Sequence, residues 1–308
     1  MSTSFSNAPA LFGRGTLRVC RRGQHHQKSI LLVALNRPAV RNAINDDMYE
    51  DLIAILQCAT HEDSISALVL TGTGSFFSSG ADLKDSRMAF VPEPSGRQTL
   101  QKPAGRFMME WIAFPKILAA AVNGPAVGIG CTLLLHCDLV HCSTGATFWA
   151  PFTRLALVPE LCSSVTFLET MGLSKSNEML LLGKQIDAPT ALQWNICSEV
   201  VAIPGDDSTT STTASFDPFD PRSLASRMCQ ELDKNLLSLP LGDRTASHFV
   251  SMIRGRRRAR LEQVCRQELV KLDERFDSGQ VQEAAQHISI GSKTKSARKE
   301  SNTISSRL

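Results

Sequence analysis

Apolar residues follow two kinds of pattern along this chain. Short unbroken apolar runs closed by turn residues predict strands at Thr16–Arg21, Ile30–Leu35, Ala67–Thr71, Ile117–Val122, Leu139–Cys142 and Val200–Ile203. Apolar residues at helical spacing predict helices that begin at Asp46 and that cover Gly130–His136, Ser163–Met171, Lys175–Leu182 and Ala188–Trp194. The first two strands are expected to form a hairpin that turns at Gly23–Gln27. Because strands and helices alternate, the pattern predicts an α/β fold.

A change in composition marks the end of this alternating region. From Pro204 to Pro221 the chain is mostly Asp, Ser and Thr, which predicts an exposed linker because such a segment buries too little apolar surface to order itself. Helical patterns resume at Ser223–Leu236 and Arg244–Asp277. We therefore expect a flexible N-terminus at 1–15, a core at 16–203, a linker at 204–221, a C-terminal helical region at 222–290 and a disordered tail at 291–308.

Charge, cysteine content and hydropathy each exclude a class of function. The net charge of +3 over 308 residues is too small for bulk attraction of an oppositely charged partner. Nine cysteines, an odd number without regular spacing, indicate thiols rather than a disulfide framework. Cysteines and histidines gather between Cys131 and Cys142 without the paired spacing of a zinc site, so no metal is expected. No apolar run approaches the roughly 20 residues that span a bilayer.

Both ends of the chain carry features of targeting segments. The last residues are Ser306, Arg307 and Leu308, a variant of the Ser-Lys-Leu address, which predicts import into the peroxisome with an import receptor as a partner. Arginines and serines precede the first acidic residue, Asp46, and this composition fits a mitochondrial transit peptide as the alternative.

Two segments rich in small residues follow predicted strands. Phe76–Lys84 comes after the strand at Ala67–Thr71, and Val122–Cys131 ends the next strand in a glycine-rich turn that opens a helix. Small residues allow a ligand to approach the backbone closely. We therefore expect backbone N–H groups from the two turns to converge on one ligand.

These two segments, in this order, resemble those of the crotonase (enoyl-CoA hydratase/isomerase) family, and the resemblance extends from Leu17 to Ile203. Asn36–Ala43 is similar to the family's CoA-binding segment, and Cys137–Leu139 is similar to its Cys-Asp step. The resemblance implies an α/β crotonase spiral of ββα units, with a C-terminal helical region that assembles homotrimers or hexamers. It also implies an acyl-CoA substrate, with coenzyme A as part of the substrate and no separate cofactor.

The same resemblance assigns residues to the site. The N–H groups of Ala81 and Ile129 would form an oxyanion hole, in which two fixed donors stabilise the negative charge that develops on a thioester oxygen. The residues expected to contact substrate or coenzyme A are Arg41, Ala43, Ser79, Gly80, Ala81, Asp82, Leu83, Gly128 and Ile129. Asp82 and Asp138 are carboxylates near this site that we expect to fix turns or helix ends rather than transfer protons.

Three positions distinguish the reactions of this family. Family hydratases carry two glutamates where this chain has Thr132 and Phe152, so the resemblance does not support hydration. Val158–Ser164 matches the segment in which Δ3,Δ2-enoyl-CoA isomerases carry one glutamate, here Glu160. A 1,3 proton shift needs only one base that reaches both carbons, and the apolar neighbours of Glu160 are expected to raise its pKa.

Several alternatives stay open at this stage. Glu160 could cap the following helix or face solvent. The chain could also be another acyl-CoA enzyme of the family, such as a hydratase-like enzyme or one of secondary metabolism, or a non-catalytic acyl-CoA binder.

The basic cluster Arg254–Arg260 has no aromatic platform for a nucleic acid, which leaves a solvated helix face or contact with CoA phosphates. A loop at Asp85–Lys102 is expected over the acyl pocket, with Met88, Phe90, Phe107, Met108 and Trp111 either lining the pocket or belonging to the core.

Overall fold

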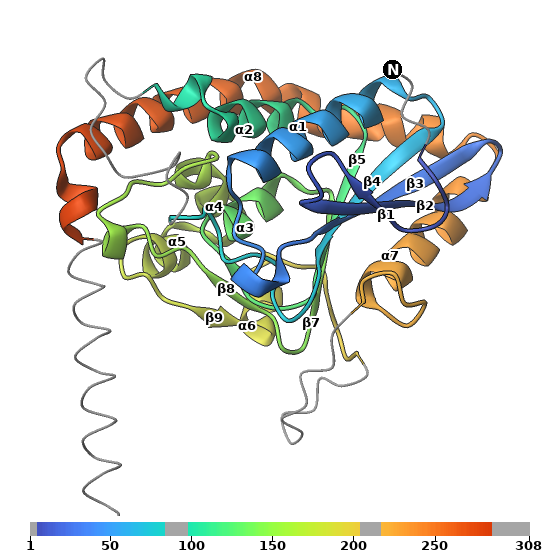
Figure 1. Cartoon of the computed structure of the whole chain (residues 1–308), viewed down its shortest axis with the longest axis horizontal. Coiled ribbons are helices and arrows are strands. Elements are labelled where there is room, and N and C mark those ends of the chain that lie inside the picture. Colours follow the sequence, from blue (N-terminus) through green and yellow to red (C-terminus); the bar gives the residue numbers. More distant parts are fainter. Residues whose placement is uncertain (1–4, 84–97, 204–216, 285–308) are drawn as a thin grey trace, which may run out of the picture.

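The computed structural model describes residues 5–83, 98–203 and 217–284. A seven-stranded sheet lies at its centre, in the order β1-β2-β3-β4-β5-β7-β10 (Figure 1). Its strands are β1 (Ala10–Phe12), β2 (Leu17–His25), β3 (Lys28–Leu35), β4 (Ile65–Gly72), β5 (Ile117–Val122), β7 (Leu139–Ser143) and β10 (Glu199–Val201). The first three strands are antiparallel, and each later strand pairs with its neighbour in parallel.

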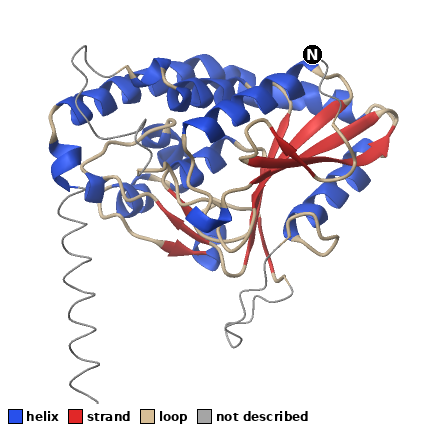
Figure 2. Cartoon of the chain, in the orientation of Figure 1, coloured by secondary structure: helices blue, strands red, loops and turns tan. Residues whose placement is uncertain are grey.

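Helices cover both faces of this sheet, because successive strand residues are apolar on opposite sides. In β3, Leu31 and Val33 belong to one hydrophobic core, whereas Ile30 and Leu32 belong to the other. The first core includes α1 (Asp46–His61), α2 (Pro103–Ala113) and the C-terminal half of α8 (Gly242–Asp277). The second core includes α7 (Leu224–Leu232). Figure 2 shows the sheet between these two helical layers.

The remaining elements complete the layer that carries the candidate site. They include the helices α3 (Ile129–Thr132), α4 (Ser163–Met171), α5 (Leu173–Leu180) and α6 (Ala188–Gln193). A second sheet, in the order β6-β8-β9, contains β6 (Ala126–Val127), β8 (Thr147–Trp149) and β9 (Ile186–Asp187). Short 3-10 helices cover Pro38–Val40, Thr99–Gln101, Leu133–His136 and Thr153–Leu155, and a π-helix covers Asp233–Leu237.

Most of the elements expected from the sequence are present. Helix α1 begins at Asp46 as expected, and the Asn45 side chain caps it by accepting a hydrogen bond of 3.1 Å from the N–H of Met48. The predicted hairpin is also present, but its turn is at His26–Gln27, since Gly23, with a positive φ, lies in an irregularity that lets the strand continue to His25. The predicted helix at Gly130–His136 is divided between α3 and the 3-10 helix.

The expectation of a flexible segment at 1–15 is wrong at Ala10–Phe12 and at Phe5. Residues Ala10–Phe12 form β1 at the edge of the sheet, and Phe5 is buried with its ring 6.0 Å from that of Phe12. Buried aromatic pairs of this kind stabilise the packing of the segments that carry them. The expected linker lies mostly outside the described residues, as do the tail from 291 and the residues Met88 and Phe90.

No helix in the described ranges has both the length and the apolar character that crossing a bilayer requires.

Candidate active site

Two turns meet at the ends of β4 and β5. Ser78 and Ala126 form a bridge in which the Ser78 N–H donates to Pro125 O at 3.2 Å and the Val127 N–H donates to Ser78 O at 2.9 Å. Gly80 has a φ of +87°, and a Cβ there would lie 2.7 Å from Val127 O. Only glycine therefore permits this approach of the two backbones.

The close approach leaves two backbone donors available at the junction. The N–H groups of Ala81 and Ile129 donate to no other group in the described part of the chain, although their neighbours Gly80, Asp82 and Gly128 all donate within the fold. Ile129 is the first residue of α3, whose N-terminal N–H groups have no partner inside the helix. The geometry thus brings together the two donors expected from the sequence.

Asn42 holds the first of these turns in place through side-chain hydrogen bonds. Its side chain is fully buried, and its amide nitrogen donates to Thr73 O at 2.9 Å and to Phe76 O at 2.8 Å. Arg41, beside it, is exposed and lies over the Phe76 ring at 5.1 Å. Asp82 accepts from Arg37 at 2.9 Å, which fits a role in fixing the turn.

Glu160 extends from the loop that connects the 3-10 helix at Thr153–Leu155 to α4. The residue is only 7% exposed, and its Oε1 accepts a hydrogen bond of 2.7 Å from the hydroxyl of Thr132. Its Oε2 is buried and has no partner among the described residues. Burial raises the pKa of Glu160 from 4.5 to about 8, while the Thr132 hydrogen bond lowers it and the charge of Glu268 raises it. Glu160 therefore does not face solvent.

The loop that carries Glu160 is held in an unusual backbone conformation. Leu161 and Cys162 both have positive φ, which non-glycine residues rarely adopt. Glu268 of α8 accepts hydrogen bonds from the Cys162 N–H at 2.6 Å and the Ser164 N–H at 3.0 Å, and it also accepts from the Ser164 hydroxyl. His136 donates from its ring to Leu161 O at 2.9 Å, and burial lowers the pKa of this histidine to about 4. These contacts fix the direction of the Glu160 side chain.

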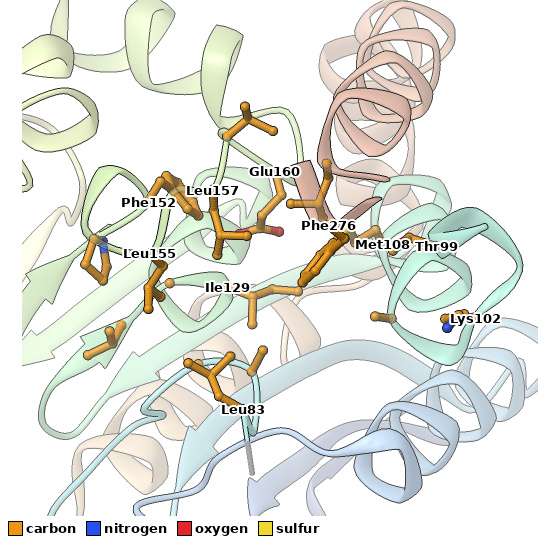
Figure 3. Close-up of a pocket in the computed structure, with 18 of the residues that line it drawn as sticks. Leu83, Thr99, Lys102, Met108, Ile129, Phe152, Leu155, Leu157, Glu160 and Phe276 are labelled. Carbon is orange, nitrogen blue, oxygen red and sulfur yellow. The ribbon is translucent and has the colours of Figure 1, made fainter. Parts of the chain in front are cut away.

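A cavity of about 140 Å³ opens between Glu160 and the two turns. Its wall is mostly apolar, and Figure 3 shows the Glu160 carboxylate pointing into it between Leu157, Ile129 and Phe276. Of the described residues that line the cavity, Glu160 carries the only carboxylate. The cavity therefore contains one candidate base in an apolar environment, which suits a group that transfers protons near neutral pH.

The cavity includes most of the residues expected from the sequence. Its lining contains Ser79, Gly80, Ala81, Leu83, Gly128, Ile129 and Glu160. Arg41, Ala43 and Asp82 lie outside that lining, at the turn beside it. Of the candidates on α2, Met108 lines the cavity, whereas Phe107 and Trp111 are almost fully buried core residues. Sequence reasoning missed Tyr49, Leu272 and Phe276, because their positions in α1 and α8 carry only an ordinary helical pattern.

The basic cluster on α8 makes contacts within the chain. Arg254 pairs with Asp138 at 3.2 Å, and Arg257 and Arg260 both pair with Glu169. Asp138 also accepts from the Leu118 N–H at 2.9 Å, which agrees with a structural role for that carboxylate. These three arginines attach α8 to the core.

Comparison with known proteins agrees with this geometry. A family model described as enoyl-CoA hydratase/isomerase matches residues 25–211, so the chain belongs to that family. The chain is 41% identical over 178 residues to human enoyl-CoA delta isomerase 2, covering 56% of this chain and 44% of that protein. It is 38% identical over 202 residues to the mouse protein "Enoyl-CoA delta isomerase 3, peroxisomal", covering 64% of this chain and 63% of the relative.

The fold comparison covers more of the chain than these sequence matches. The structure of Pseudomonas aeruginosa OdaA superposes with a TM-score of 0.74 at 28% identity, covering 89% of this chain and 98% of that one. This likeness includes the C-terminal helical region, and the crotonase-type α/β fold expected from the sequence is confirmed. The match to the human relative spans less than half of that protein's length.

Proposed function

We propose that this protein is a Δ3,Δ2-enoyl-CoA isomerase, which converts a 3-enoyl-CoA into the trans-2-enoyl-CoA. The observation that supports this most directly is the single carboxylate in the described lining of the cavity, which Ala81 and Ile129, the residues of the two backbone donors, also line. Thr132 and Phe152 occupy the positions where a hydratase of the family would have glutamates, and the Thr132 hydroxyl instead donates to Glu160. Similar proteins from human and mouse carry the name enoyl-CoA delta isomerase.

In this mechanism one carboxylate moves one proton. The Glu160 carboxylate removes a proton from C2 of the 3-enoyl-CoA, and the C–H electron pair delocalises into a dienolate. The N–H groups of Ala81 and Ile129 donate to the thioester oxygen, on which the negative charge develops. Glu160 then returns the proton to C4, so that the double bond lies between C2 and C3 and no atom is gained or lost. The unpartnered Oε2 is the oxygen available for both transfers.

Ionisation of Glu160 limits this reaction at neutral pH. A pKa of about 8 leaves roughly a tenth of the carboxylates ionised at pH 7. The same high pKa makes each ionised carboxylate a stronger base, which suits the removal of a weakly acidic C2 proton. Activity is therefore expected to rise with pH until Glu160 is fully ionised.

The test compares two reactions in two proteins. Purified wild type and Glu160→Gln are assayed for conversion of trans-3-hexenoyl-CoA to its 2-enoyl isomer, with hydration of crotonyl-CoA followed in parallel. We expect wild type to isomerise, Glu160→Gln to lose that activity, and neither to hydrate appreciably. Glu178→Gln, which changes a carboxylate paired with Lys184 outside the cavity, is the matched control and should retain activity. Hydration without isomerisation, or full isomerisation by Glu160→Gln, would contradict the proposal.

We propose that the setting of this activity is unsaturated fatty acid β-oxidation in the peroxisome, with the mitochondrion as the alternative location. The name of the mouse relative includes the peroxisome. The residues Ser306–Leu308, on which the sequence expectation rests, lie outside the described part of the chain. Fluorescent fusions with and without these three residues test the location, since loss of peroxisomal signal on their removal is the expected result.

We also propose that the chain assembles as a homotrimer or hexamer. The N-terminal half of helix α8 presents three large apolar side chains to solvent in this single chain, and an exposed apolar patch of this kind is typical of an interface. These side chains are Phe249, Met252 and Ile253, with exposed fractions of 60%, 62% and 67%. Light scattering coupled to size-exclusion chromatography should give three or six chains, and Ile253→Asp should reduce that number.

A further inference from the structure

Three potential metal ligands from three different elements meet on the sheet face opposite the cavity. His141 comes from β7, Glu199 from β10 and Glu231 from α7. The His141 Nδ1 lies 3.5 Å from a carboxylate oxygen of Glu199 and 3.9 Å from one of Glu231. All three ligand atoms lie within 4.8 Å of one another. We call these residues the His141 cluster.

The sheet register places two members of the cluster side by side. Glu199 is the Cα partner of His141 in the parallel pairing of β10 with β7, and paired residues in a sheet point to the same face. On that face, Leu139 and Val201 pack against the core that contains α7. Helix α7 contacts β7, which brings Glu231 over the same position. The backbone of the fold therefore determines this arrangement.

The two carboxylates of the cluster outnumber its single imidazole. In the described part of the chain, neither glutamate pairs with a lysine or arginine, and both have only His141 as an ion-pair partner. His141 is nearly buried, with its side chain 9% exposed, and its Nδ1 contacts these two carboxylates. A nearly buried imidazole whose Nδ1 faces two carboxylates brings three side chains of metal-ligand type to one point.

We propose that the His141 cluster binds one divalent transition-metal ion of the zinc class. One imidazole nitrogen with two carboxylate oxygens is a donor set used by tetrahedral zinc, with water at the fourth position. Ligand bonds of about 2.0–2.2 Å in a tetrahedron separate the ligand atoms by roughly 3.4 Å. The distances of 3.5 and 3.9 Å from His141 Nδ1 are close to that value, and all three ligand atoms lie within 4.8 Å of one another, so rotation of the two exposed glutamates would bring the carboxylate oxygens into ligand range. Magnesium and calcium prefer sites made only of oxygen ligands, so the imidazole nitrogen of this cluster disfavours both ions.

The bound ion joins parts of the chain that are distant in sequence. His141 and Glu199 belong to the region before residue 203, whereas Glu231 belongs to the helical region after residue 217. The cluster lies on the α7 face of the sheet, whereas Glu160 lies on the other side with α3 and α4. The ion would thus fix α7 to the edge strand β10, and the isomerisation would not depend on it directly.

Zinc titration of the metal-depleted full-length protein tests this inference. Calorimetry should give one Zn²⁺ per chain, and Zn²⁺ should raise the melting temperature because it binds the folded state. Glu199→Gln and Glu231→Gln each remove one exposed ligand without disturbing the core, and each should weaken zinc binding by about tenfold or more. Glu178→Gln is the matched control and should bind as wild type does. Unchanged binding in both cluster variants, or no binding to wild type, would overturn the proposal.

Cobalt distinguishes this cluster from the nine thiols of the chain. Co²⁺ bound to nitrogen and oxygen ligands has only visible d–d bands, whereas thiolate ligands add intense sulfur-to-cobalt charge transfer in the near ultraviolet. We expect d–d bands without charge transfer in wild type, and loss of these bands in Glu231→Gln. A charge-transfer band that persists in Glu231→Gln would assign the metal to cysteines and reject the His141 cluster. Isomerase activity is not part of this readout, so the inference stands or falls independently of the proposed function.

Discussion

Replacement of Thr132 by valine isolates the one hydrogen bond that opposes the effect of burial on Glu160. The Thr132 hydroxyl donates to Glu160 Oε1 at 2.7 Å and lowers the pKa of a carboxyl group that burial raises. Hydrogen bonds to charged groups contribute about 1.5–3 kcal/mol. Since 1.36 kcal/mol corresponds to about one pKa unit, Thr132→Val should raise the pKa of Glu160 by roughly one to two units.

The consequence is a defined change in the pH profile. With the pKa moved from about 8 to about 9 or higher, the ionised fraction of Glu160 at pH 7 falls about tenfold or more. The kcat/KM for trans-3-hexenoyl-CoA should fall by the same factor at pH 7, and the gap should narrow as the pH rises. Measurement of kcat/KM from about pH 6 to about pH 9.5 reports the pKa of the free enzyme.

Thr132→Ser is the matched control, because it keeps the hydroxyl and should keep a profile close to that of wild type. A Thr132→Val profile that overlays wild type, or that moves to lower pH, would refute the reasoning. An equal loss at every pH would also refute it, because it would indicate a distorted cavity rather than a changed ionisation.

Three further changes test other parts of the site. Glu268→Gln removes a charge that raises the pKa of Glu160, so the rise of activity should move to lower pH, with a lower plateau because one acceptor for the Glu160 loop is lost. Glu160→Gln should raise the melting temperature at alkaline pH. In wild type the folded-state pKa of Glu160, about 8, exceeds the ordinary value of 4.5, so the stability that its bound proton contributes is full below pH 4.5 and is lost as the pH rises through 8. The difference from wild type should shrink at pH 6, and thermal scans at both pH values check it. Gly80→Ala places a Cβ 2.7 Å from Val127 O at a φ of +87°, and should lower both isomerase activity and stability, the latter by about 1–3 kcal/mol in urea unfolding.

The strands and long helices were predictable because their patterns are local. Ile117–Val122 and Ser163–Met171 have the same bounds in the sequence prediction and in the structure. The short strands β6, β8 and β9 were not predicted, since segments of two or three residues have no periodicity of their own and form only where partner backbone is already in place. Strand β1 was missed for the same reason, because β2 supplies its pairing.

The candidate site was predictable only in its backbone part. The small residues at Ser79–Ala81 and Gly128 indicated the two turns, and Glu160 was indicated by its place in a motif. The direction of the Glu160 side chain depends on Glu268, which accepts a hydrogen bond from Cys162. Glu268 is far away in sequence, and the residues around it show only an ordinary helical pattern. Leu272 and Phe276 likewise line the cavity only because α8 packs beside α2.

By itself the sequence determined the alternating α/β pattern and the two turns. It also determined that Glu160 is present while Thr132 and Phe152 replace the two hydratase glutamates. These are properties of neighbouring residues. Only the tertiary structure decided which groups meet across the fold. Long-range packing removes Glu160 from water and so raises its pKa, and sheet register sets His141 beside Glu199 under Glu231. Burial and ligand geometry depend on distances between segments, and no local pattern along the chain encodes them.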